Sequence, residues 1–385
     1  MSNTTAKKLI LHVGPYKTGS TSIQRNIFKN RNIIKNECNV HYFEYNFDHG
    51  PSIRNAFHEK PETLHNNIVE GKTLEKIELE SRQVLKAIEE EIENSKCDTF
   101  LLSGEHISDL SEKSLERLKE HFSRKFSEFL IVYYLRDPKS LILSDLQEAV
   151  KTGRAVIGEW KFDYILPRYH AKIKELCRVF GSDNVTLLRF EDAVRSETGF
   201  VQYFINSIFS TPIELDEELK ANSSISNVGF NLLERLNAVC PSVKNGVRNP
   251  ERNINYVRFL KEAKGSKLSL EVPFDKTFSD KINRELSKLE RDFGVSYPHY
   301  KYTSEHLDAV TLGNSDLSSF SHYLNQQFNH IDDEKNDSAD LLRDAALKLE
   351  SEDLDFAIKL MEQAKRLRPK GPFIDKKLKE FKAKK

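Results

Sequence analysis

The chain has few of the residues from which covalent frameworks and metal clusters are built. Its 385 residues include only four cysteines, at positions 38, 97, 177 and 240, and these form no CxxC pair. Such spacing in a long chain predicts free thiols, and neither a disulfide framework nor a zinc site. We therefore expect a reducing, cytoplasmic environment and no bound metal.

Long apolar runs and an excess of charge of one sign are also missing. The apolar run from Leu9 to Val13 is too short for a signal peptide or a membrane helix. Lys and Arg total 59, as do Asp and Glu, so no overall basic field favours nucleic acid. The composition suits a soluble chain with one large domain and an appendage, or two modest domains.

Short apolar runs and amphipathic stretches alternate along the chain. The apolar runs are Lys8–Val13, Asp98–Ser103, Phe129–Leu135 and Asn184–Phe190. Stretches with helical spacing cover residues 22–36, 74–92, 115–126, 162–180, 229–239 and 279–293. Apolar strands that alternate with helices predict an α/β, three-layer, P-loop-like fold with a central parallel sheet.

The last part of the chain differs from the rest in composition. We expect a main domain at residues 1–300, a polar linker at 301–337 and a C-terminal helical hairpin at 338–385. Small residues and a proline in the hairpin follow a tetratricopeptide-like repeat; they are Ala345, Ala357, Ala364 and Pro369. One repeat cannot bury its own face, so the hairpin either docks on the main domain or binds a protein partner. The lysine-rich end, Lys376 to Lys385, predicts a solvated, frayed helix.

The segment GPYKTGSTS, from Gly14 to Ser22, has the pattern of a phosphate-binding loop between a strand and a helix. Gly14 and Gly19 allow the backbone to approach a phosphate, and the helix N-terminus presents unpaired N–H groups. Lys17 supplies a positive charge. Further hydroxyl donors are Thr18, Ser20, Thr21 and Ser22.

The loop departs from that of the nucleotide triphosphatases, GxxxxGK[ST], in one position. Gly14, Gly19 and Thr21 match this pattern, but Ser20 stands where its lysine would be. That lysine serves the β- and γ-phosphates, so its absence disfavours triphosphate chemistry. Lys17 lies three residues earlier, where it could reach the bridging oxygen between a 5′-phosphate and a sulfuryl group.

A second motif follows the third apolar run. Arg136 ends that run, Pro138 is placed to begin a helix, and Ser144 follows eight residues after the arginine. Ligands bind at the carboxyl ends of parallel strands. Arg136 and Ser144 could grip one phosphate there, the arginine as a fork and the serine as a hydroxyl.

Together, the segments from Gly14 to Gln24 and from Arg136 to Ser144 resemble the two signature motifs of sulfotransferases that use 3′-phosphoadenylyl sulfate. Ser20 replaces a usual threonine, and Tyr16 stands where relatives often have His or Arg. The resemblance spans residues 8–300 in strand order and is specific in these two motifs.

The resemblance implies a donor bound without metal and in-line transfer to a hydroxyl or amine. The acceptor expected is a glycan, a lipid head group or a small metabolite. By resemblance, the 5′-phosphosulfate is bound by Gly14, Lys17, Thr18, Gly19, Ser20 and Thr21, and the 3′-phosphate by Arg136 and Ser144.

The second apolar run ends in Ser-Gly-Glu-His, at residues 103–106. Its carboxyl end should share a sheet edge with the two phosphate motifs, so Glu105 is our first candidate for the base that accepts the acceptor proton, and His106 the second. His12, inside the first run, is expected to be a hydrogen-bonded core residue. Arg189 and Glu191 either line the site or pair with each other.

Two other functions remain open. A nucleotide or small-molecule kinase shares the loop and the fold class, but it would need a lysine at position 20 and an acidic magnesium ligand. A binding protein with a relict donor site is the second alternative, although Lys17, Glu105 and Arg136 are all retained. The aromatic run from Tyr42 to Phe47 is either an acceptor wall or an ordinary strand.

Overall fold

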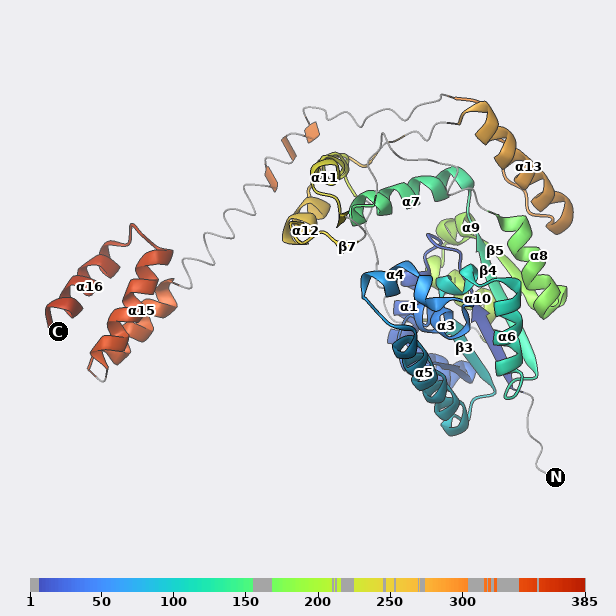
Figure 1. The fold of residues 1–385 in the computed structure, drawn as a ribbon, viewed down its shortest axis with the longest axis horizontal. Helices are drawn as coiled ribbons and strands as arrows, with labels where there is room; N and C mark the ends of the chain where they lie inside the picture. Colours follow the sequence, from blue (N-terminus) through green and yellow to red (C-terminus); the bar gives the residue numbers. More distant parts are fainter. Residues whose placement is uncertain are drawn as a thin grey trace. The chain divides into compact units, whose positions relative to one another are not determined.

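The computed structural model describes two compact units. They comprise Met1–Ile225, Phe230–Lys261 and Leu268–Val310 in the first, and Ser226–Gly229, Glu262–Lys267 and Thr311–Lys385 in the second. Within them the described residues are 7–154, 168–209, 211, 213–215, 225–244, 247–252, 254–268, 270, 274–303, 315–316, 318–319, 322–323, 339–351 and 353–384. Each unit is described by itself (Figure 1).

The first unit is built on a five-stranded parallel sheet of order β2-β3-β1-β4-β5. The strands are β1 (Lys8–His12), β2 (Val40–Tyr42), β3 (Thr99–Ser103), β4 (Glu128–Leu135) and β5 (Val185–Arg189). In the register, His12 at the end of β1 pairs with Ser103 of β3 and with Val132 of β4. The sheet confirms the predicted α/β fold class. Since β3 and β4 flank β1 on opposite sides, their carboxyl ends converge on the loop that follows β1.

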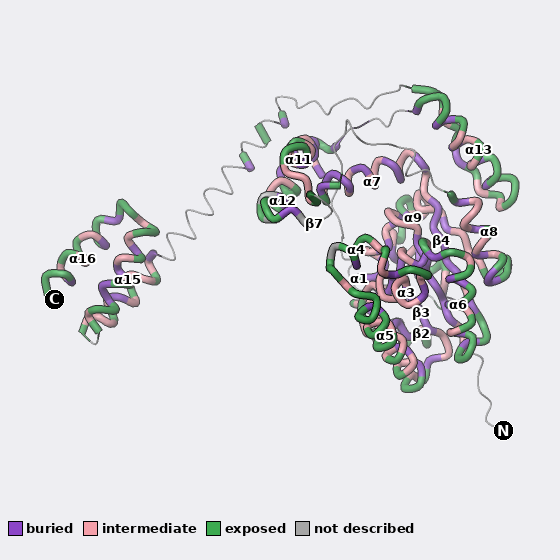
Figure 2. The backbone as a smooth tube through the Cα atoms, viewed as in Figure 1, coloured by how far each residue is buried: buried purple, intermediate pink, exposed green. Residues whose placement is uncertain are grey.

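Alternate side chains of the strands enter two separate cores, as expected of strands buried on both faces. Leu9 and Leu11 face one core, which is covered by α3 (Gly50–Phe57), α5 (Leu74–Asn94), α6 (Glu112–Phe122), α8 (Tyr169–Phe180) and α13 (Lys276–Phe293). Ile10 faces the other, which is covered by α1 (Ser20–Lys29), α2 (Arg31–Cys38), α9 (Phe190–Arg195) and α10 (Phe200–Ile208). Figure 2 shows the buried strands between helices whose outer faces are exposed.

A smaller apolar cluster lies beyond the sheet. It joins α7 (Pro138–Thr152), α11 (Asn227–Val239) and α12 (Ile254–Glu262) through buried side chains such as Leu146, Phe230 and Val257. The short elements of the first unit are α4 (His65–Val69), the 3-10 turns at Pro61–Thr63, Glu105–Asp109 and Ser182–Asn184, and a two-stranded ribbon of β6 (Val243–Lys244) and β7 (Val247–Arg248).

The structure differs from the sequence predictions in two places in the first unit. The helix expected at residues 22–36 is two helices, which meet at Asn30. β2 ends at Tyr42, the first residue of the aromatic run; Tyr42 is 1% exposed and the neighbouring Phe43 is fully buried. The acceptor-wall interpretation of these two rings is therefore wrong, because no acceptor could reach them.

In the second unit, the described residues from 339 onward form the predicted helix pair and a further helix after it. Residues 339–349 are helical, and α15 (Leu354–Leu367) and α16 (Pro372–Lys384) follow. Phe381 of α16 is fully buried in the same cluster as Ala357 and Met361 of α15. The end of the chain is therefore a packed helix and not the frayed one we expected. Most of the predicted linker at 301–337 lies outside the described residues.

Candidate anion site at the carboxyl edge of the sheet

The loop after β1 is a tight turn that requires glycine at both of its predicted glycine positions. Gly14 has a φ of 89° and Gly19 a φ of 79°, both in the left-handed region. A Cβ at residue 14 would lie 2.9 Å from the backbone of Glu105, and one at residue 19 would lie 2.4 Å from the ring of Phe200. The loop is therefore pressed against the end of β3 on one side and against α10 on the other.

The helix that follows this loop, α1, begins without a side-chain cap. Its first N–H groups have no partner inside the helix, so with the dipole they favour an anion. The neighbouring hydroxyl groups are used within the protein: Thr18 Oγ1 donates to the carbonyl of Pro15 at 2.6 Å, and Ser20 Oγ donates to Glu105. Thr21 is half-buried in the first turn.

Arg136, at the end of β4, contacts the phosphate loop directly. Its Nη1 donates to the carbonyl oxygen of Lys17, and its Nε donates to Ser140 Oγ at 2.8 Å. Its guanidinium carbon lies 4.3 Å from the ring centre of Phe190. The two motifs, which lie more than a hundred residues apart in the sequence, therefore meet at Lys17 and Arg136.

One face of α7 runs along these two cations. Ser140, Ser144 and Glu148 follow one another at four-residue spacing, so they share that face. Ser140 accepts from Arg136, and Glu148 Oε2 accepts from Lys17 Nζ at 3.3 Å. Ser144, the residue the sequence selected, is therefore placed between the arginine and the lysine. Sequence reasoning missed Ser140 and Glu148, although the same four-residue spacing could have indicated them.

The electrostatics of Glu148 show how many cations gather at this face. Burial raises the pKa of Glu148, but the positive charge of Lys17, together with those of Lys151 and Lys261, lowers it by more. The pKa of Glu148 therefore lies below its ordinary value. Burial lowers the pKa of Lys151, with Lys17 and Lys261 adding to that effect. A group of cations this close together favours a multiply charged anion.

Glu105 begins the turn after β3, beside the phosphate loop. Burial is the largest cause of its raised pKa; the hydrogen bond from Ser20 opposes the rise and the charge of Asp48 adds to it. His106 follows it, and burial lowers the pKa of this imidazole, with the charge of Arg54 acting in the same direction. A buried carboxyl group with a raised pKa is a better proton acceptor near neutral pH than an exposed one.

A polar cluster lies next to His106. Tyr16 Oη donates to Asp109, whose Oδ2 also accepts from Arg54 Nη1 at 2.7 Å. The rings of Tyr16 and His106 meet edge to face, 5.2 Å between centres. Tyr16, one of the two positions at which the loop differs from the motif it resembles, is therefore linked through Asp109 to the turn that bears Glu105. Nothing local in the sequence indicated Arg54 or Asp109.

Three other residues considered from the sequence have supporting roles. His12 is fully buried, its Nδ1 lies 2.8 Å from Ser103 Oγ, and burial lowers its pKa to about 3. Glu191 accepts from the backbone N–H of Asp137 at 2.8 Å, and Arg189 lies over the ring of Tyr297 at 4.8 Å. These contacts hold the ends of the strands in place.

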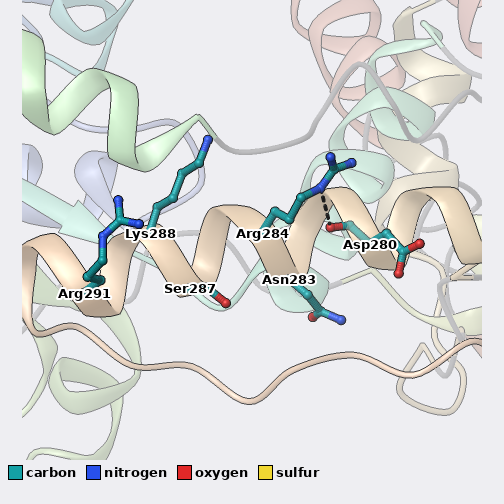
Figure 3. Close-up of a pocket in the computed structure, with 6 residues that line it drawn as sticks. All are labelled: Asp280, Asn283, Arg284, Ser287, Lys288 and Arg291. Carbon is teal, nitrogen blue, oxygen red and sulfur yellow. Dashed lines mark hydrogen bonds between the residues drawn. The ribbon is translucent and has the colours of Figure 1, made fainter.

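A shallow pocket elsewhere on the first unit follows one polar face of α13. It is lined by Asp280, Asn283, Arg284, Ser287, Lys288 and Arg291, which recur at helical spacing (Figure 3). None of these residues belongs to the strand ends described above. Asn283 also holds the backbone of Tyr300, which in turn donates its hydroxyl to Asp137. The face of α13 therefore serves the site indirectly.

The described residues lack both a membrane-spanning helix and a metal cluster. No helix among them is long and apolar enough to cross a membrane. In that same part of the chain, no group of three or more His, Cys, Asp or Glu side chains could hold a metal ion.

Two solved structures are similar to this chain. One is a sulfotransferase from Alicyclobacillus acidocaldarius, at 13% identity and a TM-score of 0.43, covering 74% of this chain and 95% of that one. The other is the sulfotransferase domain from the curacin biosynthetic pathway, at 14% identity and a TM-score of 0.35, covering 74% of this chain and 97% of that one. No family model and no curated protein matches the sequence. Since both TM-scores are low, the function proposed below rests on the residues of this chain.

Proposed function

We propose that the chain is a sulfotransferase that moves a sulfuryl group from 3′-phosphoadenylyl sulfate to the hydroxyl or amine of a glycan, lipid head group or small metabolite. The observation that carries the proposal is the contact between Arg136 and the carbonyl of Lys17. It joins a loop suited to a 5′-phosphosulfate with an arginine suited to a 3′-phosphate, and Glu105 lies against the same loop.

The residues fit such a donor in charge and in backbone geometry. The uncapped start of α1 presents its first backbone N–H groups, and the glycine turns give the loop the shape that brings it to this helix start. Lys17 and Arg136 flank Ser144 along α7, and Lys151 and Lys261 add further positive charge nearby. Ser20 is committed to Glu105 through its hydroxyl, so its backbone N–H is the group that we assign to the phosphate.

In the reaction we propose, the acceptor oxygen or nitrogen forms a bond to sulfur while the bond from sulfur to the bridging phosphate oxygen breaks. Glu105 takes the acceptor proton, and adenosine 3′,5′-bisphosphate leaves. Lys17 stabilises the charge that develops on the leaving oxygen, which requires its ammonium group to move from Glu148. No step needs a metal ion, so we expect turnover to survive EDTA.

Calorimetry with three nucleotides tests the donor site. We expect micromolar binding of adenosine 3′,5′-bisphosphate and at least about tenfold weaker binding of adenosine 5′-monophosphate, about 1.4 kcal/mol. Equal affinities would show that Arg136 and Ser144 do not form a 3′-phosphate site. Tighter binding of ATP with magnesium, together with activity that EDTA abolishes, would favour a kinase instead.

Turnover is tested with labelled donor and a panel of acceptors from the three chemical classes. Transfer of label to one class identifies the acceptor. A chain that binds the bisphosphate but transfers label to none of these classes would be a binding protein with a relict donor site, which was the second alternative from the sequence.

A further inference from the structure

A buried histidine, His49, is hydrogen-bonded to the end of β3, directly before the turn that carries Glu105. His49 is fully buried; its backbone N–H donates to the carbonyl of Ser103 at 3.1 Å, and its Nδ1 accepts from the N–H of Ser103 at 3.0 Å. The remaining ring N–H then donates to the carbonyl of Phe43 at 2.9 Å. His49 is therefore neutral, and burial lowers its pKa to about 4.

Asp48, next to this histidine, ties together three elements around the turn. Its Oδ1 accepts from Gln24 Nε2 at 3.0 Å and from the backbone N–H of Gly50 at 2.9 Å. Gln24, on α1, also donates to the carbonyl of Ser103 at 3.2 Å. The carboxylate of Asp48 is thus linked to the phosphate-loop helix, to the start of α3 and to the end of β3.

The backbone of Gly104, directly before Glu105, is closely packed against Gly50. A Cβ at Gly104 would lie 2.3 Å from the Cα of Gly50, so the two glycines are in direct contact. Gly104 also donates its N–H to the carbonyl of His12 at 2.9 Å. Any shift of the Asp48–Gly50 segment would therefore displace residue 104 and the glutamate that follows it.

Two carboxyl groups in this region, those of Asp48 and Glu105, form no ion pair within the described residues. Asp109 is paired with Arg54 at 2.7 Å, and Lys17 with Glu148 at 3.3 Å. Within the described ranges, no Lys, Arg or His forms an ion pair with Asp48; its carboxylate is held by the amide of Gln24 and one backbone N–H.

We propose that Asp48 is a positioning residue for Glu105, which fixes the turn after β3 through Gln24 and Gly50 and keeps an unpaired negative charge beside the base. The inference rests on the proposed role of Glu105. Because the charge of Asp48 opposes ionisation of Glu105, it raises the proton affinity of the base above the level that burial alone gives.

Several charged and titratable groups face Glu105 from the elements packed around it. They are Lys17 and Tyr16 from the phosphate loop, Asp48 from the segment before α3 and Asp109 from the turn itself, and Ser20 of α1 donates a hydrogen bond to Glu105. Arg54 of α3 acts on the neighbouring His106. Ser20 and Lys17 lower the pKa of Glu105, whereas burial, Asp48 and Asp109 raise it. Removing the unpaired charge of Asp48 should therefore lower it.

Asp48→Asn tests this directly, because the amide oxygen of asparagine can accept the same two hydrogen bonds without the charge. The titration of Glu105 is followed by NMR on protein with ¹³C-labelled Glu carboxyl groups, assigned by comparison with Glu105→Gln. We expect the midpoint of the Glu105 titration to move to lower pH, and the acid limb of the pH profile of kcat/KM to move with it. On the plateau of that profile, kcat should fall about threefold. Affinity for adenosine 3′,5′-bisphosphate should stay within about twofold.

Asp98→Asn is the matched control, since it removes the same charge at the opposite end of β3, where Asp98 accepts from Asn39 at 3.2 Å. This control should leave the midpoint of the Glu105 titration unchanged. An unchanged midpoint in Asp48→Asn, or an equal shift in the control, would overturn the inference. The NMR titration needs no turnover, so it decides the role of Asp48 even if no acceptor is sulfated and the proposed function fails.

Gln24→Leu separates the mechanical part of the role from the charge. This variant keeps Asp48 but removes both hydrogen bonds of the glutamine amide, so the Glu105 midpoint should not fall. We expect kcat to fall about tenfold at unchanged KM for the donor, because a small displacement of the base reduces the rate. Wild-type kcat in a folded Gln24→Leu protein, verified by thermal unfolding, would contradict the positioning role.

Discussion

The ends of β3 and β4 lie on either side of the same loop, yet they are held by different kinds of interaction. At the end of β3, the groups that contact Ser103 are uncharged: His12 and His49 contact Ser103, and Gln24 donates to the Ser103 carbonyl. Two glycines in contact complete this support.

At the end of β4, charged and aromatic groups surround Arg136. Tyr169 Oη donates to its carbonyl at 2.8 Å, and Phe190 lies under its guanidinium group. The next residue, Asp137, caps α7 by accepting from the N–H of Ser140 at 2.9 Å and also accepts from Tyr300 Oη. This end therefore contains carboxylates that offset the cation.

Because the two strand ends are supported differently, one edge of the sheet can hold both a base and a phosphate-binding residue. An uncompensated carboxyl group at β3 retains a high proton affinity, which suits a base. A compensated arginine at β4 remains ordered and charged, which suits a phosphate-binding residue. Substitutions at each strand end distinguish these two roles.

Glu105→Gln should give the largest effect. It keeps the shape but removes the base, so kcat should fall by roughly 10²- to 10⁴-fold while affinity for adenosine 3′,5′-bisphosphate stays unchanged. Since the pKa of Glu105 is raised in the folded chain, its ionised form lowers stability at any pH above its unfolded pKa. The variant should therefore unfold at a higher temperature at neutral pH. If this variant turns over normally while His106→Ala is inactive, the base is His106.

Lys17→Ala should lower kcat by about 10²-fold or more, because the lysine acts on charge that grows in the transition state. Affinity for the product nucleotide should fall less, and calorimetry beside steady-state kinetics separates the two. Glu148→Gln is the control: it releases Lys17 from its ion pair, so KM for the donor should fall. A higher donor KM in Glu148→Gln would contradict the arrangement on α7.

Arg136→Ala should act on binding and much less on kcat. Adenosine 3′,5′-bisphosphate should bind at least about tenfold more weakly, while adenosine 5′-monophosphate should lose less, because the arginine is assigned to the 3′-phosphate. Calorimetry on the two proteins with the two nucleotides forms a thermodynamic cycle. An equal loss for both nucleotides would show that Arg136 supports the loop without contacting the 3′-phosphate.

Tyr300→Phe should give the smallest effect. It removes the hydroxyl that donates to Asp137, so the free energy of unfolding should fall by about 1.5–3 kcal/mol, the range typical of a hydrogen bond to a charged group. Nucleotide affinity should fall about threefold because the start of α7 becomes less ordered. Tyr302→Phe is the matched control, since Tyr302 is 57% exposed. Similar losses in both variants would mean that the Tyr300 contact does not support Asp137.

The local parts of this protein followed from the sequence alone. The four predicted strands agree with β1, β3, β4 and β5 to within two residues at either end, and Gly14 and Gly19 adopt the left-handed conformation their loop requires. Apolar runs and glycine turns depend on neighbours along the chain, so a single sequence is sufficient to find them. The parallel pairing of the strands also followed, since strands separated by helices pair in parallel; the strand order did not.

Only the tertiary structure decided which groups surround each functional residue. Tyr300 donates a hydrogen bond to Asp137, which is 163 positions away in the sequence, and Arg54 donates to Asp109, which is 55 positions away. The unpaired charge of Asp48 and the contact of Gly50 with Gly104 likewise depend on where β2 and α3 lie against β3. Hydrogen bonds, burial and the pKa shifts that follow from them arise between residues distant in the chain. The pattern of one sequence therefore placed Glu105 and Arg136 at the sheet edge, but folding alone gave them different surroundings.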